Sequence, residues 1–319
     1  MGGSPVVNFL LTSFAPLPRM AIVLLLACGG AHAQTCTVSL PTIAFGNVDV
    51  LPNTEVDLTA TVTVTCSGGT GRAIACISMG TGSASDATSR QMTSGSNTAR
   101  YDLYTNANRT KLLGSWQTGY DGSNGIQLSV PKNGSNTATI YAKFFASQKA
   151  VLPGTYTATF TANPFMQYGL KGTADCPTGT STASTSTSVT ATVISNCNVS
   201  ATAVNFGSKG LLTSNTDAQG TLSIQCSSSL PYTVSLDGGT SGATNPTQRK
   251  MAFSGANVTY GLYQDAARSL PWGNSVGTNT TSGTGTGSTQ TQTVYGRVPV
   301  QTTPQPGSYS DSVIVTVGY

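Results

Sequence analysis

Charge and histidine are both scarce in this sequence. Of its 319 residues, 8% are Asp, Glu, Lys or Arg, and the formal net charge is +4. Such a small and dispersed charge argues against a nucleic-acid partner or an acidic substrate. The one histidine, His32, lies in a segment that we expect to be removed, which leaves the mature chain without an imidazole for a catalytic triad or a metal site. No useful pair of carboxylates stands out either. We therefore predict that the protein is not an enzyme and uses no cofactor and no metal.

Apolar residues at helical spacing are also missing. The chain instead contains many short runs of alternating apolar and polar residues, separated by clusters of turn-forming residues such as glycine and asparagine. This pattern is typical of an all-β protein. An apolar fraction of 38% and matched cysteines favour packed cores over disorder, although Gly, Ser and Thr are abundant.

The first 33 residues have the features of an export signal. Arg19 precedes the apolar run Ala21–Ala27, and a small-x-small cleavage pattern ends at Ala33. The run is too short, and its flanks are wrong, for a membrane-spanning helix. We therefore predict a signal peptide and a secreted protein. Lipoprotein processing at Cys28 and a later start codon remain alternatives.

The rest of the chain contains one module twice. A Cys, a Phe-Gly pair, a second Cys, a Tyr-x-Leu-Tyr motif and a Pro-Gly-x-Tyr motif follow each other in both halves. The matched positions are Cys36 and Cys197, Phe45 and Phe206, Cys66 and Cys226, Tyr101 and Tyr260, and Pro153 and Pro306. We predict two tandem β-sandwich domains, residues 34–195 and 196–319, here called the first and the second repeat.

Six cysteines remain after the signal is removed, and in an exported protein they predict disulfides. Two pairs occupy matching positions in the two repeats, and the two cysteines left over would pair with each other. The predicted disulfides are Cys36–Cys66, Cys197–Cys226 and Cys76–Cys176. The alternative is a thiolate metal site, but no Cys-x-x-Cys spacing supports it.

The first repeat carries one more strand-like segment than the second. In Thr187–Ser195, alternate residues Val189, Ala191 and Val193 share one face, whereas the second repeat stops at Tyr319. We expect the extra segment to complete the first sandwich. The second sandwich would then lack its last strand and need one from another polypeptide, because an open edge leaves backbone groups unpaired.

In these motifs the chain resembles the spore coat protein U domain family, which includes subunits of archaic, Csu-type chaperone–usher pili. The resemblance covers both repeats. It implies incomplete immunoglobulin-like sandwiches: a periplasmic chaperone first supplies the missing strand, and the N-terminal extension of the next subunit then replaces it. Two copies in tandem resemble the tip subunit of such a pilus. Only Gln34 and Thr35 precede Cys36 in the mature chain, too few to lend a strand, so we expect the chain to end a fibre.

The resemblance also implies a location and partners. The protein would pass through the periplasm and an outer-membrane usher to the cell surface, accept a strand from the adjacent pilus subunit, and attach to an abiotic or host surface in biofilm formation. The chaperone or the subunit would bind the last strand by edge pairing. The residues that share one face of this strand are Tyr309, Val313, Val315, Val317 and Tyr319. A spore or cell-surface coat protein assembled by the same strand exchange is the alternative.

One connecting segment of the first repeat is unusually apolar. Between residues 163 and 170 it carries four large side chains, and two more aromatic residues are expected beside it. The candidates for surface adhesion are Phe165, Met166, Tyr168, Leu170, Trp116 and Tyr120. Loops normally face water, so one hypothesis is an exposed adhesive surface, and the other is an extra strand packed on the core. We match Trp116 with Trp272 of the second repeat, which favours a structural role for it. A carbohydrate-binding platform of Trp116, Tyr120 and Tyr168 is a third hypothesis.

Overall fold

The computed structural model of the protein describes residues 33–86, 88–116, 120, 125–170, 176 and 181–319. The predicted signal peptide lies outside these residues except for its last position. In the described part, every regular element is a β-strand, which confirms the all-β prediction. A search of the same residues finds no helix long and apolar enough to cross a membrane.

Among the described residues, twelve strands lie in the first repeat and eight in the second. Those of the first repeat are β1 (Thr35–Ser39), β2 (Ile43–Val48), β3 (Val56–Ser67), β4 (Ala73–Ser78), β5 (Arg90–Ser94), β6 (Asn97–Tyr104), β7 (Ile126–Val130), β8 (Gly134–Phe144), β9 (Gly154–Phe160), β10 (Phe165–Leu170), β11 (Ser181–Ser184) and β12 (Thr187–Val193). Those of the second are β13 (Cys197–Ala201), β14 (Thr216–Cys226), β15 (Pro231–Leu236), β16 (Arg249–Phe253), β17 (Ala256–Tyr263), β18 (Thr281–Thr284), β19 (Gln290–Val298) and β20 (Val315–Gly318).

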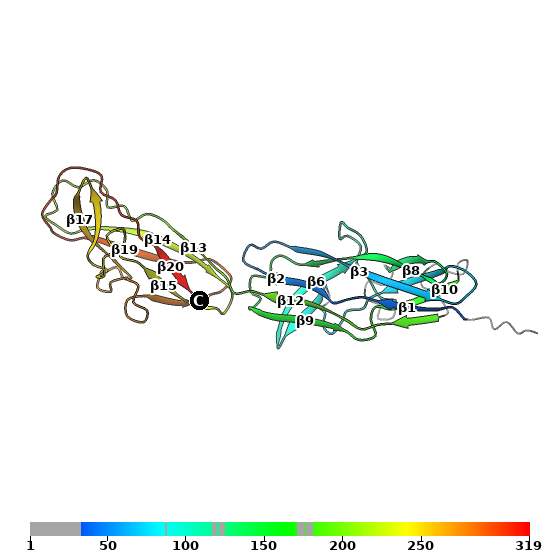
Figure 1. Ribbon diagram of the computed structural model, residues 1–319. Helices are drawn as coiled ribbons and strands as arrows, with labels where there is room; N and C mark the ends of the chain where they lie inside the picture. The colour runs from blue at the N-terminus through cyan, green and yellow to red at the C-terminus, as the bar shows by residue number, and fades with distance from the viewer. Residues whose placement is uncertain (1–32, 87, 117–119, 121–124, 171–175, 177–180) are drawn as a thin grey trace, which may run out of the picture.

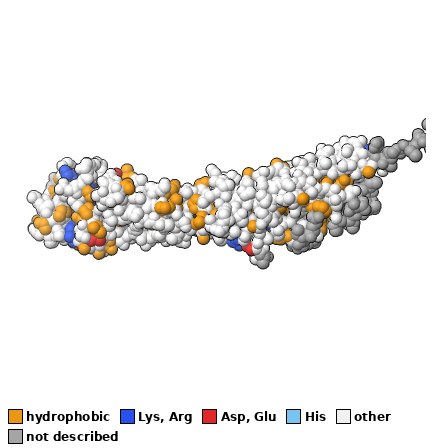
Figure 2. All heavy atoms as spheres, turned by 90° about the horizontal axis from the view of Figure 1, so that it is seen from below, with side chains coloured by type: hydrophobic (Ala, Val, Ile, Leu, Met, Phe, Trp, Pro, Cys, Tyr) orange, Lys and Arg blue, Asp and Glu red, His pale blue; other side chains and the backbone are white. Residues whose placement is uncertain are grey.

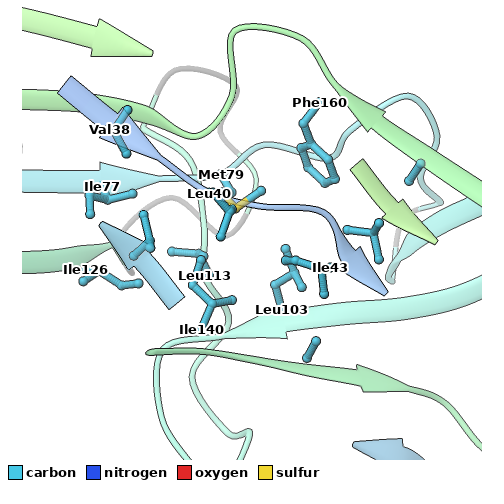
Figure 3. Close-up of a cluster of buried hydrophobic side chains, with 14 of the residues drawn as sticks. Val38, Leu40, Ile43, Ile77, Met79, Leu103, Leu113, Ile126, Ile140 and Phe160 are labelled. Carbon is cyan, nitrogen blue, oxygen red and sulfur yellow. The ribbon is translucent and has the colours of Figure 1, made fainter. Parts of the chain in front are cut away.

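The first repeat is a two-layer sandwich. Its larger sheet has the order β1-β3-β8-β6-β5-β9-β12-β2, and its smaller sheet has the order β11-β10-β4-β7. Both sheets point apolar side chains inward, such as Ile140 of β8 and Ile77 of β4, and Figure 3 shows part of this core. Full burial of such a side chain contributes ~1.5–3 kcal/mol, so the core is the main stabilising element.

The second repeat follows the same plan with fewer strands. Its sheets have the orders β13-β14-β19-β17-β16 and β18-β15-β20. Its core contains Trp272, whose indole nitrogen donates a hydrogen bond to the carbonyl oxygen of Val234 at 3.1 Å. The four sheets contain strands of one repeat each, so each sandwich is built from its own stretch of chain.

All three disulfides are those predicted from the repeat. Cys36–Cys66 joins β1 to β3, and Cys197–Cys226 joins β13 to β14 at the matching place. Cys76–Cys176 links residues 100 positions apart within the first repeat. In the chain-entropy model, cross-links of these lengths each contribute ~3–5 kcal/mol by restricting the unfolded chain.

Strand β12 closes the first repeat, as predicted from the alternation in Thr187–Ser195. It pairs antiparallel with β9 over its whole length and parallel with β2 on its other side. Val189, Ala191 and Val193 are buried in the core. The first sandwich is therefore completed by its own chain.

The two repeats lie end to end (Figure 1) and point in the same direction along the molecule. The end of the first repeat opposite its Cys36–Cys66 disulfide faces the disulfide end of the second. At this junction the side-chain amide of Asn196 donates a hydrogen bond to the carboxylate of Asp49 at 2.6 Å. The C-terminus of the chain also lies near the junction (Figure 1).

Candidate functional site: the open edge of the second repeat

The main difference between the repeats lies where β12 sits in the first. There, β12 fills the space between β2 and β9. Counting from the matched Phe-Gly and Pro-Gly-x-Tyr motifs, the counterparts of β2 and β9 in the second repeat are residues 204–209 and 307–313. Within the described chain, no strand lies between these two segments. We call the facing edges of residues 204–209 and 307–313 the open edge.

Backbone pairing at the open edge is sparse. In the first repeat, β9 forms seven residue pairs with β12 and one, Thr93 with Thr157, with β5. In the second repeat, residues 307–313 form only the bridge between Ala252 and Ser310, which corresponds to the pair with β5. Unpaired N–H and C=O groups in a row are a ready template for a strand from another chain.

Side chains at the open edge pack as their counterparts in the first repeat do, but they are more exposed to solvent. Phe206 packs edge to face on Tyr260, with ring centroids 6.1 Å apart, as Phe45 packs on Tyr101 at 6.4 Å. Yet Phe45 is buried and Phe206 is only half-buried. The same holds for Ile43 and its counterpart Val204. The core of the second repeat is therefore packed like that of the first, but it is accessible to solvent along one side.

Exposed apolar residues show the same asymmetry over the whole described chain. Every large hydrophobic side chain that is strongly exposed belongs to the second repeat: Val199, Leu211, Phe253, Leu270, Val276, Val300, Ile314 and Tyr319. Figure 2 shows hydrophobic side chains reaching the surface of the second repeat. These side chains are spread over strands and loops of the second repeat, and none of them lies within residues 204–209 or 307–313.

The predicted binding strand borders the open edge. Tyr309, Val313, Val315 and Val317 all pack against the core of the second repeat, half-buried, and share one face as expected. Tyr319 does not pack there and is 60% exposed. Only the last part of the segment forms a strand, β20, which pairs with β15 from Val315 to Gly318.

Most of the apolar segment, residues 165–170, forms strand β10, so the hypothesis of an extra strand packed on the core holds there and that of an exposed adhesive loop is wrong for Met166 and Tyr168. Strand β10 pairs with β4 on one side and with β11 on the other. Met166 is fully buried and Tyr168 is 6% exposed, because alternate residues of β10 face the core. Phe165 is half-buried, and the side chain of Leu170 lies outside the described part.

The two aromatic residues expected beside this segment are engaged in the first repeat. Tyr120 donates a hydrogen bond to the Asp102 carboxylate at 2.9 Å, and the Arg90 guanidinium lies 4.4 Å from the centre of its ring. Burial, followed by the nearby Asp102 charge, raises the pKa of Tyr120 above its usual value. Trp116 is half-buried. With Tyr168 in the core and Tyr120 held by Asp102, a sugar-stacking platform of the three rings is not formed.

Trp272 is not the counterpart of Trp116. The backbone N–H of Trp272 donates to the Leu262 carbonyl, and the N–H of Leu113 donates to the Leu103 carbonyl, both at 2.8 Å. Because Leu103 and Leu262 occupy matching positions, Trp272 corresponds to Leu113. Both side chains are buried in their cores.

A buried arginine in each repeat was not predicted. Arg90 donates to the carbonyl oxygens of Gly80, Met79 and Leu113 and forms an ion pair with Asp102. Arg249 donates to four carbonyl oxygens: Asp237, Pro246, Leu236 and Trp272. Burial lowers the pKa of Arg249, although a guanidinium stays protonated in proteins. Both arginines begin an Arg-x-Met motif that occurs once in each repeat, and this repetition is the sequence signal that could have identified them.

The described residues contain no group of three or more His, Cys, Asp or Glu side chains that could hold a metal ion. The buried ion pair of Arg90 and Asp102 braces the first repeat from inside, since neither side chain is more than 1% exposed. The arrangement at the open edge is suited to pairing with a β-strand.

Comparison with known proteins agrees with this architecture. A family model for the Spore Coat Protein U domain matches residues 24–163 and 183–316. The crystal structure of the CsuC–CsuE chaperone–tip adhesion subunit pre-assembly complex, from archaic chaperone-usher Csu pili of Acinetobacter baumannii, matches with a TM-score of 0.52 and 17% identity. That match covers 89% of this chain and 100% of the other, and at this identity it shows a shared fold.

Other comparisons are weaker. The CupB6 tip adhesin from Pseudomonas aeruginosa matches with a TM-score of 0.37 and 9% identity, over 88% of this chain and 93% of its own. A TM-score this low does not show a shared fold. No curated protein matches the chain by sequence.

Proposed function

Because the chain belongs to the Spore Coat Protein U domain family, we propose that it is the tip subunit of a chaperone–usher pilus. In this proposal the second repeat accepts a β-strand from another polypeptide, first from a periplasmic chaperone and then from the adjacent pilus subunit at the outer-membrane usher. The first repeat, which its own β12 completes, is the part that meets an abiotic or host surface in attachment and biofilm formation.

The open edge is the observation that carries the proposal. The same fold occurs twice in one chain, and the first copy shows what the second lacks, namely a strand between residues 204–209 and 307–313. Strand β12 supplies that element in the first repeat with three inward apolar side chains. A foreign strand with the same alternation would therefore fit the second repeat in the same way.

The energetics favour strand acceptance. An inserted strand with about four inward apolar side chains gains on the order of 6–12 kcal/mol gross from burial. It also pairs the backbone groups of residues 307–313, which otherwise face water. Without it, the half-buried core should make the second repeat marginally stable and prone to edge-to-edge aggregation.

The structural likeness agrees with this assignment. The similar Acinetobacter baumannii structure is described as a complex of a chaperone with a tip adhesion subunit. Two disulfides at matching positions, Cys36–Cys66 and Cys197–Cys226, fit export to an oxidising compartment. For surface attachment, the remaining candidates are Phe165 and Trp116, which are half-buried, and Leu170, whose side chain lies outside the described part.

A direct test gives the second repeat a strand of its own. The mature chain, residues 34–319, is extended after Tyr319 by a flexible Gly/Ser linker and a copy of Thr187–Ser195. The C-terminus lies at the junction end, where the counterpart of β12 would enter (Figure 1). We expect the extended chain to be a soluble monomer and the unextended chain, produced without a chaperone, to aggregate. The control extension has Asp at the three inward positions and should not rescue solubility.

Amide hydrogen exchange supplies the second readout. In the extended chain, the amides of residues 307–313 and 204–209 should become protected, because they then lie in a paired ladder. A soluble unextended chain in which these amides are already protected would overturn the proposal.

Electron microscopy of cells that display the protein separates the two kinds of assembly. Fibres that carry the protein would favour a pilus tip, and a non-fibrous surface layer would favour a coat protein that assembles by the same strand exchange.

A further inference from the structure

The junction between the repeats is made by two specific ends. The first repeat contributes two loops, one with Asp49 and one with Lys149. Asp49 accepts the hydrogen bond from Asn196 at 2.6 Å. The Lys149 backbone approaches Gly287 so closely that a Cβ atom on this glycine would clash with the Lys149 carbonyl oxygen. The second repeat contributes its disulfide end, since Asn196 and Gly287 flank Cys197 and Cys226 in the hydrogen-bond network.

The same two loops exist in the second repeat, at its outer end. The sequence from Phe45 to Leu51 aligns without a gap with that from Phe206 to Leu212. The loop with Lys149 corresponds to the loop after β19. Gln148 bonds both backbone groups of Arg100, and Gln301 bonds both backbone groups of Thr259 in the same way. The outer end of the second repeat is therefore built like the end of the first that contacts a following module.

These two loops form one surface. The backbone N–H of Leu212 donates to the Thr303 hydroxyl at 2.9 Å, and the N–H of Gln301 donates to the Leu212 carbonyl at 3.1 Å. We call residues 209–212 together with residues 300–303 the end face. Leu211 is 72% exposed, whereas its counterpart Val50 is 5% exposed and belongs to the core of the first repeat. Val300, on the other loop, is 60% exposed.

We propose that the end face is a docking surface for a further module of the same fold, which presents its disulfide end as the second repeat does at the junction. The proposal rests on strand acceptance at the open edge and names a second contact with the same partner. A strand that filled the open edge in the direction of β12 would enter at the junction and leave at the outer end, as β12 leaves toward the second repeat (Figure 1). The module attached to that strand would therefore start at the end face.

Repetition of this contact is geometrically consistent. Both repeats point in the same direction, and a head-to-tail contact between unlike ends can be repeated from one module to the next. Leu211 and Val300 would supply the apolar centre of the contact.

The chemistry of the partner differs from that of the second repeat itself. Lys209 and Gly210 stand in the places of Val48 and Asp49. The end face thus has glycine in the place of the junction's carboxylate and an exposed cation one residue before it, and an asparagine in the position of Asn196 would find no acceptor side chain. The fitting partner is a different chain whose disulfide end carries a carboxylate or an uncommitted carbonyl toward Lys209, because complementary charge selects partners at such contacts.

Site-specific photo-cross-linking in piliated cells of the producing bacterium tests this docking. A photoreactive phenylalanine is placed at Leu211 in the end face, at Phe206 in the open edge, or at Val276, which is 76% exposed on another loop. We expect cross-links from Leu211 and Phe206 to the same partner chain and none from Val276. Mass spectrometry should map the Leu211 cross-link to the disulfide end of the partner and the Phe206 cross-link to its N-terminal strand.

The outcomes separate the two proposals. Cross-links from Phe206 without any from Leu211 would refute docking at the end face and leave strand acceptance intact. Absence of both, in cells that display the protein, would refute strand acceptance as well. A cross-link from Leu211 to a protein without this fold would also refute the docking proposal.

Substitution gives an independent measure. The double variant Leu211→Asp with Val300→Asp should increase the rate at which the tip dissociates from purified fibres by about tenfold or more, since ~1.4 kcal/mol corresponds to a factor of ten. Val276→Asp is the control and should leave the rate unchanged. An unchanged rate in the double variant would count against the end face as a contact.

Discussion

Tyr156 and Tyr309 occupy the same position in the two repeats and make the same hydrogen bond, but only one of them is covered. The Tyr156 hydroxyl donates to the Leu152 carbonyl at 2.9 Å, and that of Tyr309 donates to the Gln305 carbonyl at 2.7 Å. Tyr156 is fully buried, whereas Tyr309 is half-buried. Desolvation accordingly raises the pKa of Tyr156. The local structure around each tyrosine is thus set by the repeated sequence, whereas the burial of its ring depends on a neighbouring strand.

Substitution within β12 should unfold the first repeat. Val189 is fully buried, so Val189→Asp places a charge in the core and should destabilise this repeat by at least ~3 kcal/mol. Chemical denaturation followed by circular dichroism measures the loss. The matched control is Thr190→Asp on the other face of the strand, which is only half-buried and should have a much smaller effect. Equal effects of the two variants would contradict the role assigned to β12.

Neighbouring residues of β10 should behave differently. Met166 is fully buried, and Met166→Ser should destabilise the first repeat by ~2–4 kcal/mol because it leaves a cavity and buries a hydroxyl. Phe165→Ser should change stability less, because Phe165 is half-buried. Attachment of cells to plastic, measured for Phe165→Ser at normal pilus number, then tests the surface role. Undiminished attachment would remove Phe165 from the adhesive surface.

Arg249 should be essential for the stability of the second repeat, because it is buried and holds together several backbone segments. Arg249→Ala leaves the carbonyl groups of Leu236, Asp237 and Trp272 without their donor and should cost ~2–4 kcal/mol. Thermal unfolding of the strand-extended chain measures the loss. Lys250→Ala changes the exposed neighbour and serves as the control. A melting temperature equal to that of the control would show that water replaces the guanidinium.

Acid should weaken the second repeat partly through Asp217. Its pKa lies below the ordinary value, chiefly because Arg297 donates hydrogen bonds to it at 2.7 and 2.9 Å and also because Arg268 lies nearby. A lowered pKa in the folded state stabilises the fold above the unfolded pKa of about 4, and this contribution is lost as the pH falls through the folded value. Asp217→Asn should therefore reduce stability at pH 7 more than at pH 2.

The matching position in the first repeat provides the control for this prediction. Asp57 pairs with Arg109 at 3.0 Å, but Lys143, the counterpart of Arg297, pairs with Glu55. Asp57→Asn should accordingly reduce stability at pH 7 less than Asp217→Asn does. Urea unfolding at pH 7 and at pH 2 gives the comparison. A variant Asp217→Asn with the same pH dependence as the unsubstituted chain would refute the assignment.

The fold could be predicted in considerable detail because the repeat acts as an internal comparison. Matched cysteines identified the disulfides, and the alternation of Val189, Ala191 and Val193 identified the strand that closes the first repeat. Both signals are local and periodic, and both depend on backbone geometry that is the same in every sandwich. The missing strand of the second repeat followed from the same comparison.

Long-range pairing could not be predicted from the same signals. The sequence left open whether residues 163–170 form an exposed loop or an extra strand, because β10 forms only through pairing with β4, far away in the sequence. The pairing registers also show that β10 corresponds to β20. Met166 of β10 pairs with Ile77 of β4, and Val317 of β20 pairs with Val234 of β15, the counterpart of β4. The burial of Arg90 and Arg249 could not be predicted because charged residues are expected at the surface. It depends on the backbone carbonyl groups that surround each guanidinium and accept its hydrogen bonds.

The direction of β12 has a mechanical consequence. This strand continues through residues 194–196 directly into the second repeat, so tension along the molecule pulls β12 along its own axis. Its pairings with β9 and β2 run parallel to that force. The hydrogen bonds of seven residue pairs must then shear together, whereas a strand pulled from its end at right angles would unzip one bond at a time. A molecule loaded between a surface and a cell would hold best in this geometry, and its lifetime under load would depend on the barrier to that concerted step.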